Sequence, residues 1–174
     1  MELCNDTDTG CEAIAIPHNP NLSNGQMFRI EYEKLPLDEQ KTAAALRTKL
    51  EPIVEMMQIK GESECRNGMY GVVGAEDELC DFEKVRDFGQ PELSDCGESA
   101  EFGAQAGRGC TSRTDYVRFA LIEGLREKQR IGINPYSFGF IGSTDNHMAS
   151  PGSVSESGAP GKFTATNDQL LTIN

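Results

Sequence analysis

Residues 53–59 read Ile-Val-Glu-Met-Met-Gln-Ile, and this short apolar run decides the fold class of the chain. An apolar run of this length between polar segments is typical of a buried β-strand. The segment before it, residues 38–50, has apolar residues at helical spacing and is ended by Pro52. The pattern therefore predicts a helix that leads directly into a strand.

The rest of the chain repeats this alternation of helix and strand. Short apolar runs at residues 13–17 and 138–144 predict two further strands, the first of them buried. Residues 113–130 have the pattern of a second helix. The apolar stripe of that helix consists of Val117, Leu121 and Leu125. Strands that alternate with helices pair in parallel through crossover connections, so we expect an α/β fold.

A long stretch without periodicity, residues 60–112, precedes the second predicted helix. It contains four of the six cysteines, and irregular stretches of this length in compact domains are usually functional or cross-linked. Pairing of sequence neighbours is the simplest arrangement, with bonds Cys4–Cys11, Cys65–Cys80 and Cys96–Cys110. Such disulfides would place the protein in the periplasm or outside the cell, whereas scattered thiols would suit the cytoplasm.

The overall charge limits the partners of the protein. The chain has 174 residues, with 16 Lys and Arg against 28 Asp and Glu, which gives a formal net charge of −12. Such a surface repels nucleic-acid backbones and anionic lipids. No apolar run is long enough to cross a bilayer, and residues 1–10 lack the pattern of a secretory signal. We expect neither a nucleic-acid partner nor a membrane partner, and the oligomeric state stays open.

The chain has only two histidines, and each follows a predicted strand. Asp145 and His147 are separated by one residue, so on an extended backbone their side chains point the same way. A carboxylate and an imidazole at the carboxyl end of a strand suit a divalent metal, and His18 follows the first predicted strand in the same manner. The alternatives are a surface turn at Asp145, and a His18 that bonds a loop or acts as a general base.

Glu55 is an acidic residue within an otherwise apolar strand. Its burial is costly unless the carboxylate is paired or binds a metal. Glu55 could be a metal ligand, could orient a histidine, or could form an ion pair with a core arginine such as Arg118. Gln58 and Lys60 share the opposite face of the strand and could reach an anionic substrate.

Four blocks of the chain resemble an uncharacterised bacterial family, domain of unknown function family 3604. The block around His18 reads Ala-Ile-Pro-His-Asn at 15–19 and Asn-Leu-Ser-Asn-Gly at 21–25. The other blocks contain Glu55-x-x-Gln58-Ile59-Lys60, Asp115-Tyr116-Val117-Arg118 and Asp145-x-His147. The blocks occur in the family's order and cover residues 12–150.

The family is similar to PHP-type metal-dependent phosphoesterases and, more distantly, to amidohydrolases. The resemblance implies a partial (β/α) barrel of PHP-like type with a long irregular insertion. It implies that His18, Asp145 and His147 hold a divalent ion of zinc, manganese or iron. Glu55 and Lys60 become the catalytic candidates, the first orienting the metal shell and the second pairing with an anionic small-molecule substrate. The implied reaction is hydrolysis by water that the metal activates.

Related enzymes carry an early His-x-His motif and more strands than this sequence predicts. We therefore expect residues 1–150 to be the C-terminal part of a PHP-like metal-dependent hydrolase domain that is incomplete alone. Residues 151–174 are rich in Gly, Ser and Pro and would form a flexible tail. The alternative is a non-catalytic, disulfide-stapled extracellular binding module, in which the cysteines and the acidic loop are the main feature.

Overall fold

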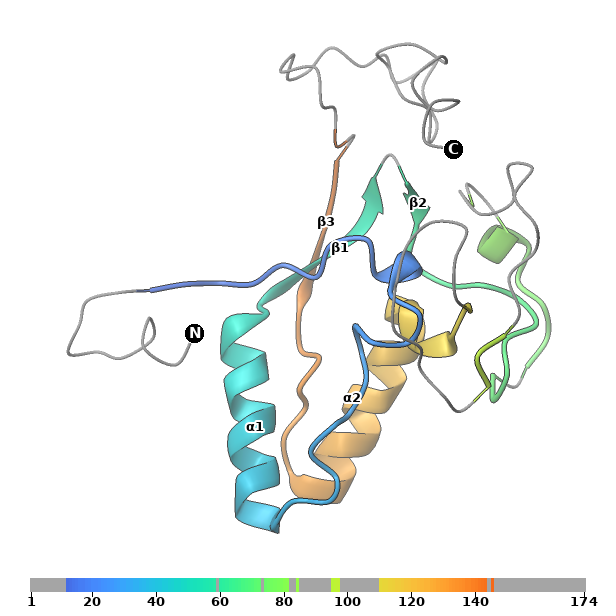
Figure 1. The fold of residues 1–174 in the computed structure, drawn as a ribbon. Coiled ribbons are helices and arrows are strands. Elements are labelled where there is room, and N and C mark those ends of the chain that lie inside the picture. The colour runs from blue at the N-terminus through green and yellow to red at the C-terminus, as the bar shows by residue number, and fades with distance from the viewer. Residues whose placement is uncertain are drawn as a thin grey trace.

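The computed structural model describes residues 12–58, 60–72, 74–81, 84, 95–97, 110–143 and 145. Its longer elements are helices α1 (Leu37–Leu50) and α2 (Val117–Ile131) and strands β1 (Ile53–Gln58), β2 (Gly61–Glu62) and β3 (Gly139–Gly142). Figure 1 shows a small sheet rather than a barrel in this part of the chain, so the fold is mixed α/β. α1, β1 and β3 lie where the sequence predicted a helix at 38–50 and strands at 53–59 and 138–144.

β1 is the central strand of the sheet, whose order is β2-β1-β3. β1 and β3 run parallel, with Ile53 opposite Gly139 and Val54 opposite Phe140. The connection between them includes α2, so the predicted parallel pairing through a helical crossover is confirmed. β2 pairs antiparallel with β1 across a tight turn. The apolar pattern did not predict this hairpin, because β2 is too short to have a pattern of its own.

The prediction of a buried strand at residues 13–17 is wrong. The segment passes beside the junction of α1 and β1, where the Ala15 N–H donates one hydrogen bond at 2.6 Å and the Pro17 carbonyl accepts one at 3.1 Å. These two bonds do not make a regular strand, and Pro17 has no N–H that could extend a ladder. The side chains of Ile14 and Ile16 are exposed rather than buried.

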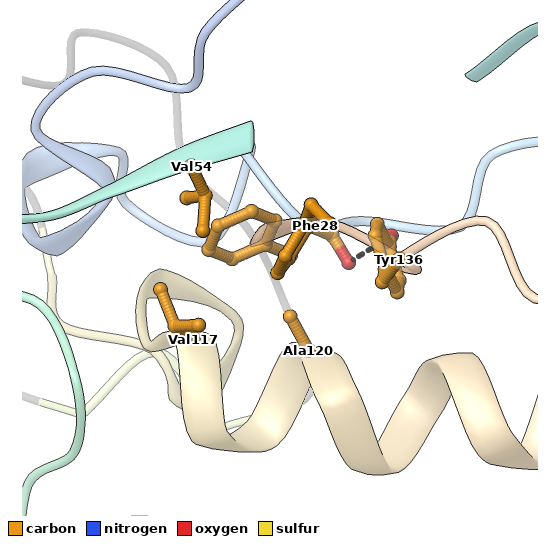
Figure 2. Close-up of a cluster of buried hydrophobic side chains, with 6 residues drawn as sticks. Phe28, Val54, Val117, Ala120 and Tyr136 are labelled. Carbon is orange, nitrogen blue, oxygen red and sulfur yellow. Dashed lines mark hydrogen bonds between the residues drawn. The ribbon is translucent and has the colours of Figure 1, made fainter. Parts of the chain in front are cut away.

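The hydrophobic core joins β1 and α2 to the segments that precede α1 and β3 (Figure 2). Its buried members are Phe28, Val54, Val117, Ala120, Tyr136 and Phe138. The rings of Phe28 and Tyr136 meet edge to face with their centroids 5.7 Å apart. The Tyr136 hydroxyl donates to the Phe28 carbonyl oxygen at 2.7 Å. Burial raises the pKa of the Tyr136 hydroxyl, because the ionised form would lose its hydration.

α2 buries a different stripe from the one that the sequence predicted. Its buried residues are Val117, Ala120, Gly124, Glu127 and Ile131. Of the predicted stripe, Val117 is buried, Leu121 is partly buried and Leu125 is exposed. A Cβ at Gly124 would collide with Oδ1 of Asn134, so the segment that leads to β3 packs directly on the helix backbone. This close approach, rather than a row of leucines, determines the buried face of α2.

Disulfides join Cys65 to Cys80 and Cys96 to Cys110. Both bonds confirm the predicted pairing of sequence neighbours, and they are compatible with an extracellular location. Cys4, Cys11 and the predicted tail at 151–174 lie outside the described residues. Neither α1 nor α2 has the length and apolar character needed to cross a membrane, and no other described helix does.

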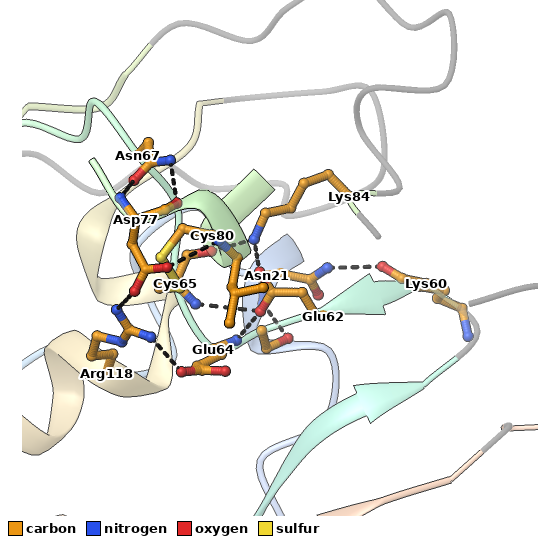
Figure 3. A network of polar contacts seen from close by, with 12 residues as sticks. Asn21, Lys60, Glu62, Glu64, Cys65, Asn67, Asp77, Cys80, Lys84 and Arg118 are labelled. Carbon is orange, nitrogen blue, oxygen red and sulfur yellow. Dashed lines mark hydrogen bonds and ion pairs between the residues drawn. A yellow bond between two sulfur atoms is a disulfide. The ribbon is translucent and has the colours of Figure 1, made fainter. Parts of the chain in front are cut away.

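The loop closed by the first disulfide is held by polar contacts as well (Figure 3). Asn67 and Asp77 exchange two hydrogen bonds, at 2.8 and 3.0 Å. The guanidinium group of Arg118 donates to Glu64 at 2.5 Å and to Asp77 at 2.9 Å. The hydrogen bonds from Arg118 and from the Leu79 N–H lower the pKa of the Asp77 carboxyl. The disulfide thus closes this irregular loop, and the ion pairs of Arg118 attach it to the first turn of α2.

Removal of a core ring should cost far more stability than removal of a surface ring. Phe28 is 1% exposed, whereas Phe140 of β3 is 53% exposed. We expect Phe28→Ala to lower the free energy of unfolding by about 3–5 kcal/mol and Phe140→Ala by about 1 kcal/mol. Urea denaturation followed by circular dichroism measures both losses. Equal losses in the two variants would contradict the position of the core.

Loss of the first disulfide should destabilise the protein, because the unfolded chain gains conformational entropy when the cross-link is removed. The bonded cysteines are 15 positions apart, and the chain-entropy model gives about 3 kcal/mol for a loop of this length. We expect the double variant Cys65→Ser, Cys80→Ser to lose roughly this free energy of unfolding in the same urea assay. Mass-spectrometric mapping of the non-reduced wild type is the check on connectivity. Peptides that join either cysteine to another partner would show that the pairing is incorrect.

Candidate functional site

His18 follows the extended segment beside β1, and Glu55 lies within β1. Nδ1 of His18 is 2.6 Å from Oε2 of Glu55, and this oxygen also accepts from the Asn19 N–H at 3.2 Å. The side chain of His18 is 53% exposed, whereas that of Glu55 is only 9% exposed. Because an ionised carboxylate can only accept, Nδ1 carries the hydrogen of this bond. In the neutral ring Nε2 then keeps its lone pair and is able to bind another group.

The alternation of side chains along β1 explains how Glu55 reaches this position. Val54 points into the hydrophobic core, so its neighbour Glu55 points to the opposite face of the sheet. There the two donors from His18 and Asn19 offset the cost of burying the carboxylate. Of the interpretations of Glu55, the contact with a histidine is present. The alternative partner, Arg118, instead binds Glu64 and Asp77.

Lys60 lies in the turn between β1 and β2, and its Nζ donates to Oδ2 of Asp145 at 2.6 Å. Both side chains are partly buried. Asp145 follows β3 and has a φ of 51°, in the left-handed region. The extended backbone on which the common direction of Asp145 and His147 depended is therefore not maintained at Asp145. His147 lies outside the described residues, and its predicted place beside Asp145 stays a prediction.

The two pairs belong to elements that run in the same direction. β1 and β3 are parallel, and Lys60 follows the end of β1 as Asp145 follows the end of β3. His18 follows residues 13–17. This segment runs parallel to the chain at the α1–β1 junction, because the later of its two hydrogen bonds reaches a later residue of that chain. The structure thus brings His18 to Glu55 and Lys60 to Asp145. These are contacts between elements, and no local motif contains them.

A short 3-10 helix, η2 (Pro20–Leu22), follows the histidine in the chain and is hydrogen-bonded to the turn that carries Lys60. Nδ2 of Asn21 donates to the Lys60 carbonyl at 2.8 Å, and the Asn21 N–H donates to Oγ of Ser63 at 3.3 Å. Figure 3 shows the amide of Asn21 directed at this turn. On the other side, Oε1 of Gln58 accepts from the Lys60 N–H at 2.6 Å. Both polar groups of Lys60's backbone are therefore bound, which restricts the turn.

Some buried polar atoms near these pairs lack a hydrogen-bond partner within the part of the chain that the structure describes. They are Oδ1 of Asn19, Oδ1 of Asn21 and Nε2 of Gln58. Native proteins rarely leave such atoms unpaired, so they mark places where water, an ion or a ligand group would bind. Sequence reasoning missed Asn19 and Asn21 as site residues. The signal that could have found them is the concentration of asparagine just after His18.

The donor groups suit a divalent ion in kind. Nε2 of His18 and the carboxylate of Asp145 are donors that zinc, manganese and iron accept. Among the described residues, however, no three His, Cys, Asp or Glu side chains are grouped closely enough to hold a metal. The predicted ligand set therefore needs a contribution from outside the described residues, where His147 lies.

Fold and site together define an α/β protein with disulfides, a histidine–carboxylate pair and a lysine–carboxylate pair beside parallel strands. The chain matches the model of the family described as Protein of unknown function (DUF3604) over residues 2–172, and it belongs to this family. Comparison with curated proteins and with solved structures found no significant match. The family resemblance of the sequence blocks is thereby confirmed. The similarity to PHP-type enzymes stays a prediction.

The contact between His18 and Glu55 predicts the tautomer of the histidine ring. In protein labelled with ¹⁵N-histidine, we expect NMR to show His18 protonated at Nδ1, because Glu55 accepts that hydrogen. Glu55→Ala should remove this preference and shift the ring toward the other tautomer. Glu51→Ala is the matched control, because it removes a nearby acid that pairs with Arg47 instead. The contact would be disproved if His18 stayed protonated at Nδ1 in Glu55→Ala as it does in Glu51→Ala.

Proposed function

We propose that the protein is a divalent-metal-dependent hydrolase whose ion is held by His18, Asp145 and His147. The observation that carries the proposal is the contact between Nδ1 of His18 and the buried carboxylate of Glu55. Metal-binding histidines commonly donate their second ring nitrogen to a carboxylate, which fixes the tautomer and orients the ring. Glu55 would do this for His18 and leave Nε2 for the ion.

Lys60 is the group that would pair with an anionic small-molecule substrate. Its ammonium group already contacts Asp145, so it would lie next to the ion that this carboxylate helps to hold. Positive charge beside a metal site favours anionic substrates and stabilises negative charge that develops during hydrolysis. Because Asn21 and Gln58 bind the backbone of Lys60, the turn presents the ammonium group from a restricted position.

A divalent ion at this place would lower the pKa of a water molecule and stabilise negative charge on the substrate oxygen. The side chains of the protein prepare the site for it. Glu55 holds the ring of His18, and Lys60 compensates the charge of Asp145. The buried oxygen atoms of Asn19 and Asn21 offer acceptors for a hydroxyl group or a water molecule. Zinc, manganese and iron all suit this mixture of nitrogen and oxygen donors.

The proposal includes a (β/α) barrel of PHP-like type as the fold of the whole domain. Its support is the unit formed by β1, α2 and β3, which is a parallel strand pair with a helical crossover. In such barrels the reactive groups follow the carboxyl ends of the strands. Lys60 and Asp145 occupy such positions here, directly after β1 and β3.

A non-catalytic extracellular binding module is the second candidate function. The disulfide Cys65–Cys80 and the bridge that Arg118 makes across the same loop favour it, since cross-linked irregular loops are typical of secreted binding domains. A periplasmic or secreted location suits both candidates. They differ in their need for a metal, which the following prediction uses.

We expect the purified full-length protein to retain a transition metal after dialysis, measured by inductively coupled plasma mass spectrometry. The double variant His18→Ala, His147→Ala should bind that metal with at least roughly tenfold lower affinity, because two of three ligands are removed. Asp145→Ala should weaken binding in the same direction. Asp38→Ala is the matched control, because Asp38 is an exposed carboxylate in the first turn of α1.

Unchanged metal content in the double histidine variant would remove the ligand assignment. A wild-type protein that binds no zinc, manganese or iron would favour the extracellular binding module. Loss of metal in Asp38→Ala as well would mean that the variants measure folding rather than ligation.

A further inference from the structure

Asp115 is fully buried, with 0% exposure, and it ends η5 (Arg113–Asp115), a short 3-10 helix before α2. Its Oδ1 accepts from the Ser23 hydroxyl and from the Gly25 N–H, both at 2.6 Å. Its Oδ2 accepts from the Ser112 N–H at 2.8 Å. The carboxylate therefore joins the start of α2 to the loop that follows the candidate metal-binding histidine.

That loop, residues 19–25, is held by groups that lie far away in the sequence. Asn19 binds Glu55, Asn21 binds Lys60, and Ser23 and Gly25 bind Asp115. Asn19 has a φ of 50°, a conformation that costs energy for a residue with a side chain and persists only where the surroundings hold it. Movement at one end of this short loop would therefore be transmitted to His18 at the other end.

We infer that Asp115 is a positioning residue for the imidazole ring of His18, acting through residues 19–25. The inference rests on the proposed function, because it gives His18 the task of binding an ion. A metal site needs its ligands within about 0.5 Å of the productive geometry, so the loop that carries a ligand must be held. The bonds of Asp115 also give a role to the sequence blocks at 21–25 and 115–118.

The chemistry of the anchor suits a side chain with two acceptor oxygens. All the groups that meet Asp115 from these partners are donors, namely one hydroxyl and two backbone N–H groups. Only a carboxylate can accept from all of them. In Asp115→Asn the new NH₂ group must face either the two donors of the loop or the Ser112 N–H, so at least one of the three bonds is lost at almost unchanged side-chain size.

Glu127 provides a matched control, because it is also a buried carboxylate but lies at the other end of α2. It is 4% exposed and accepts two hydrogen bonds from Arg130, both at 2.7 Å. This pair lies near the C-terminal end of α2, whereas Asp115 precedes its first turn. Glu127→Gln should therefore lower stability without an effect on residues 19–25.

The experiment compares the full chain with Asp115→Asn, Ser23→Ala and Glu127→Gln. The first measurement is the ¹⁵N NMR spectrum of His18 in metal-free protein, and the second is the affinity for Zn²⁺ in competition with a chromogenic chelator. We expect Asp115→Asn to lose the Nδ1–H signal of His18 and to bind Zn²⁺ roughly tenfold more weakly. Ser23→Ala should change both quantities in the same direction by less. Glu127→Gln should change neither, although its melting temperature falls.

Unchanged His18 spectra and unchanged Zn²⁺ affinity in folded Asp115→Asn and Ser23→Ala variants would overturn the inference, because Ser23→Ala removes a bond to the loop whichever way the new amide turns. If Asp115→Asn does not fold, Ser23→Ala decides in the same way, since it removes one of the three donors to Asp115 together with the acceptor of the Met27 N–H. Equal effects in Asp115→Asn and Glu127→Gln would reduce Asp115 to a purely structural role. Absence of Zn²⁺ binding in the wild type would count against the proposed function, while the metal-free spectra would still decide whether Asp115 positions His18.

Discussion

The candidate site depends on one constraint, the buried carboxylate of Glu55 within an apolar strand. A charge at this position is stable only if donors reach it from elsewhere in the chain. They come from His18 and Asn19, which are 37 and 36 positions away. The hydrogen bonds that Glu55 requires therefore hold the loop before α1 against β1 and orient the only described histidine.

Because its side chains alternate, β1 contributes to the core and to the site at once. Val54 packs with Phe28 on one face, and Glu55 receives its donors on the other. In the irregular region between β2 and η5, none of the described residues belongs to the two hydrophobic clusters, and disulfides cross-link the chain. There Lys84 is buried and pairs with Glu62 beside the Cys65–Cys80 disulfide (Figure 3). Packing, ion pairs and cross-links thus hold different parts of the same small fold.

Local patterns predicted the main elements well, because apolar spacing and proline act over a few residues. They failed where a distant segment decided the result. The leucine stripe of α2 did not predict the buried face, because the chain around Asn134 approaches the backbone at Gly124. The apolar run at 13–17 is not a regular strand and its isoleucines are exposed. Apolar composition alone therefore did not predict burial.

The sequence by itself determined α1, β1, β3 and the need of Glu55 for a partner, and it made neighbour pairing the simplest arrangement of the cysteines. Each of these follows from residues close together in the chain or from the cost of burying one charge. Only the tertiary structure decided that this partner is His18, and that Lys60 meets Asp145 across 85 positions. The physical reason is that these side chains meet only when three features are in place. They are the turn between β1 and β2, the register of β1 with β3 and the left-handed backbone conformation of Asp145.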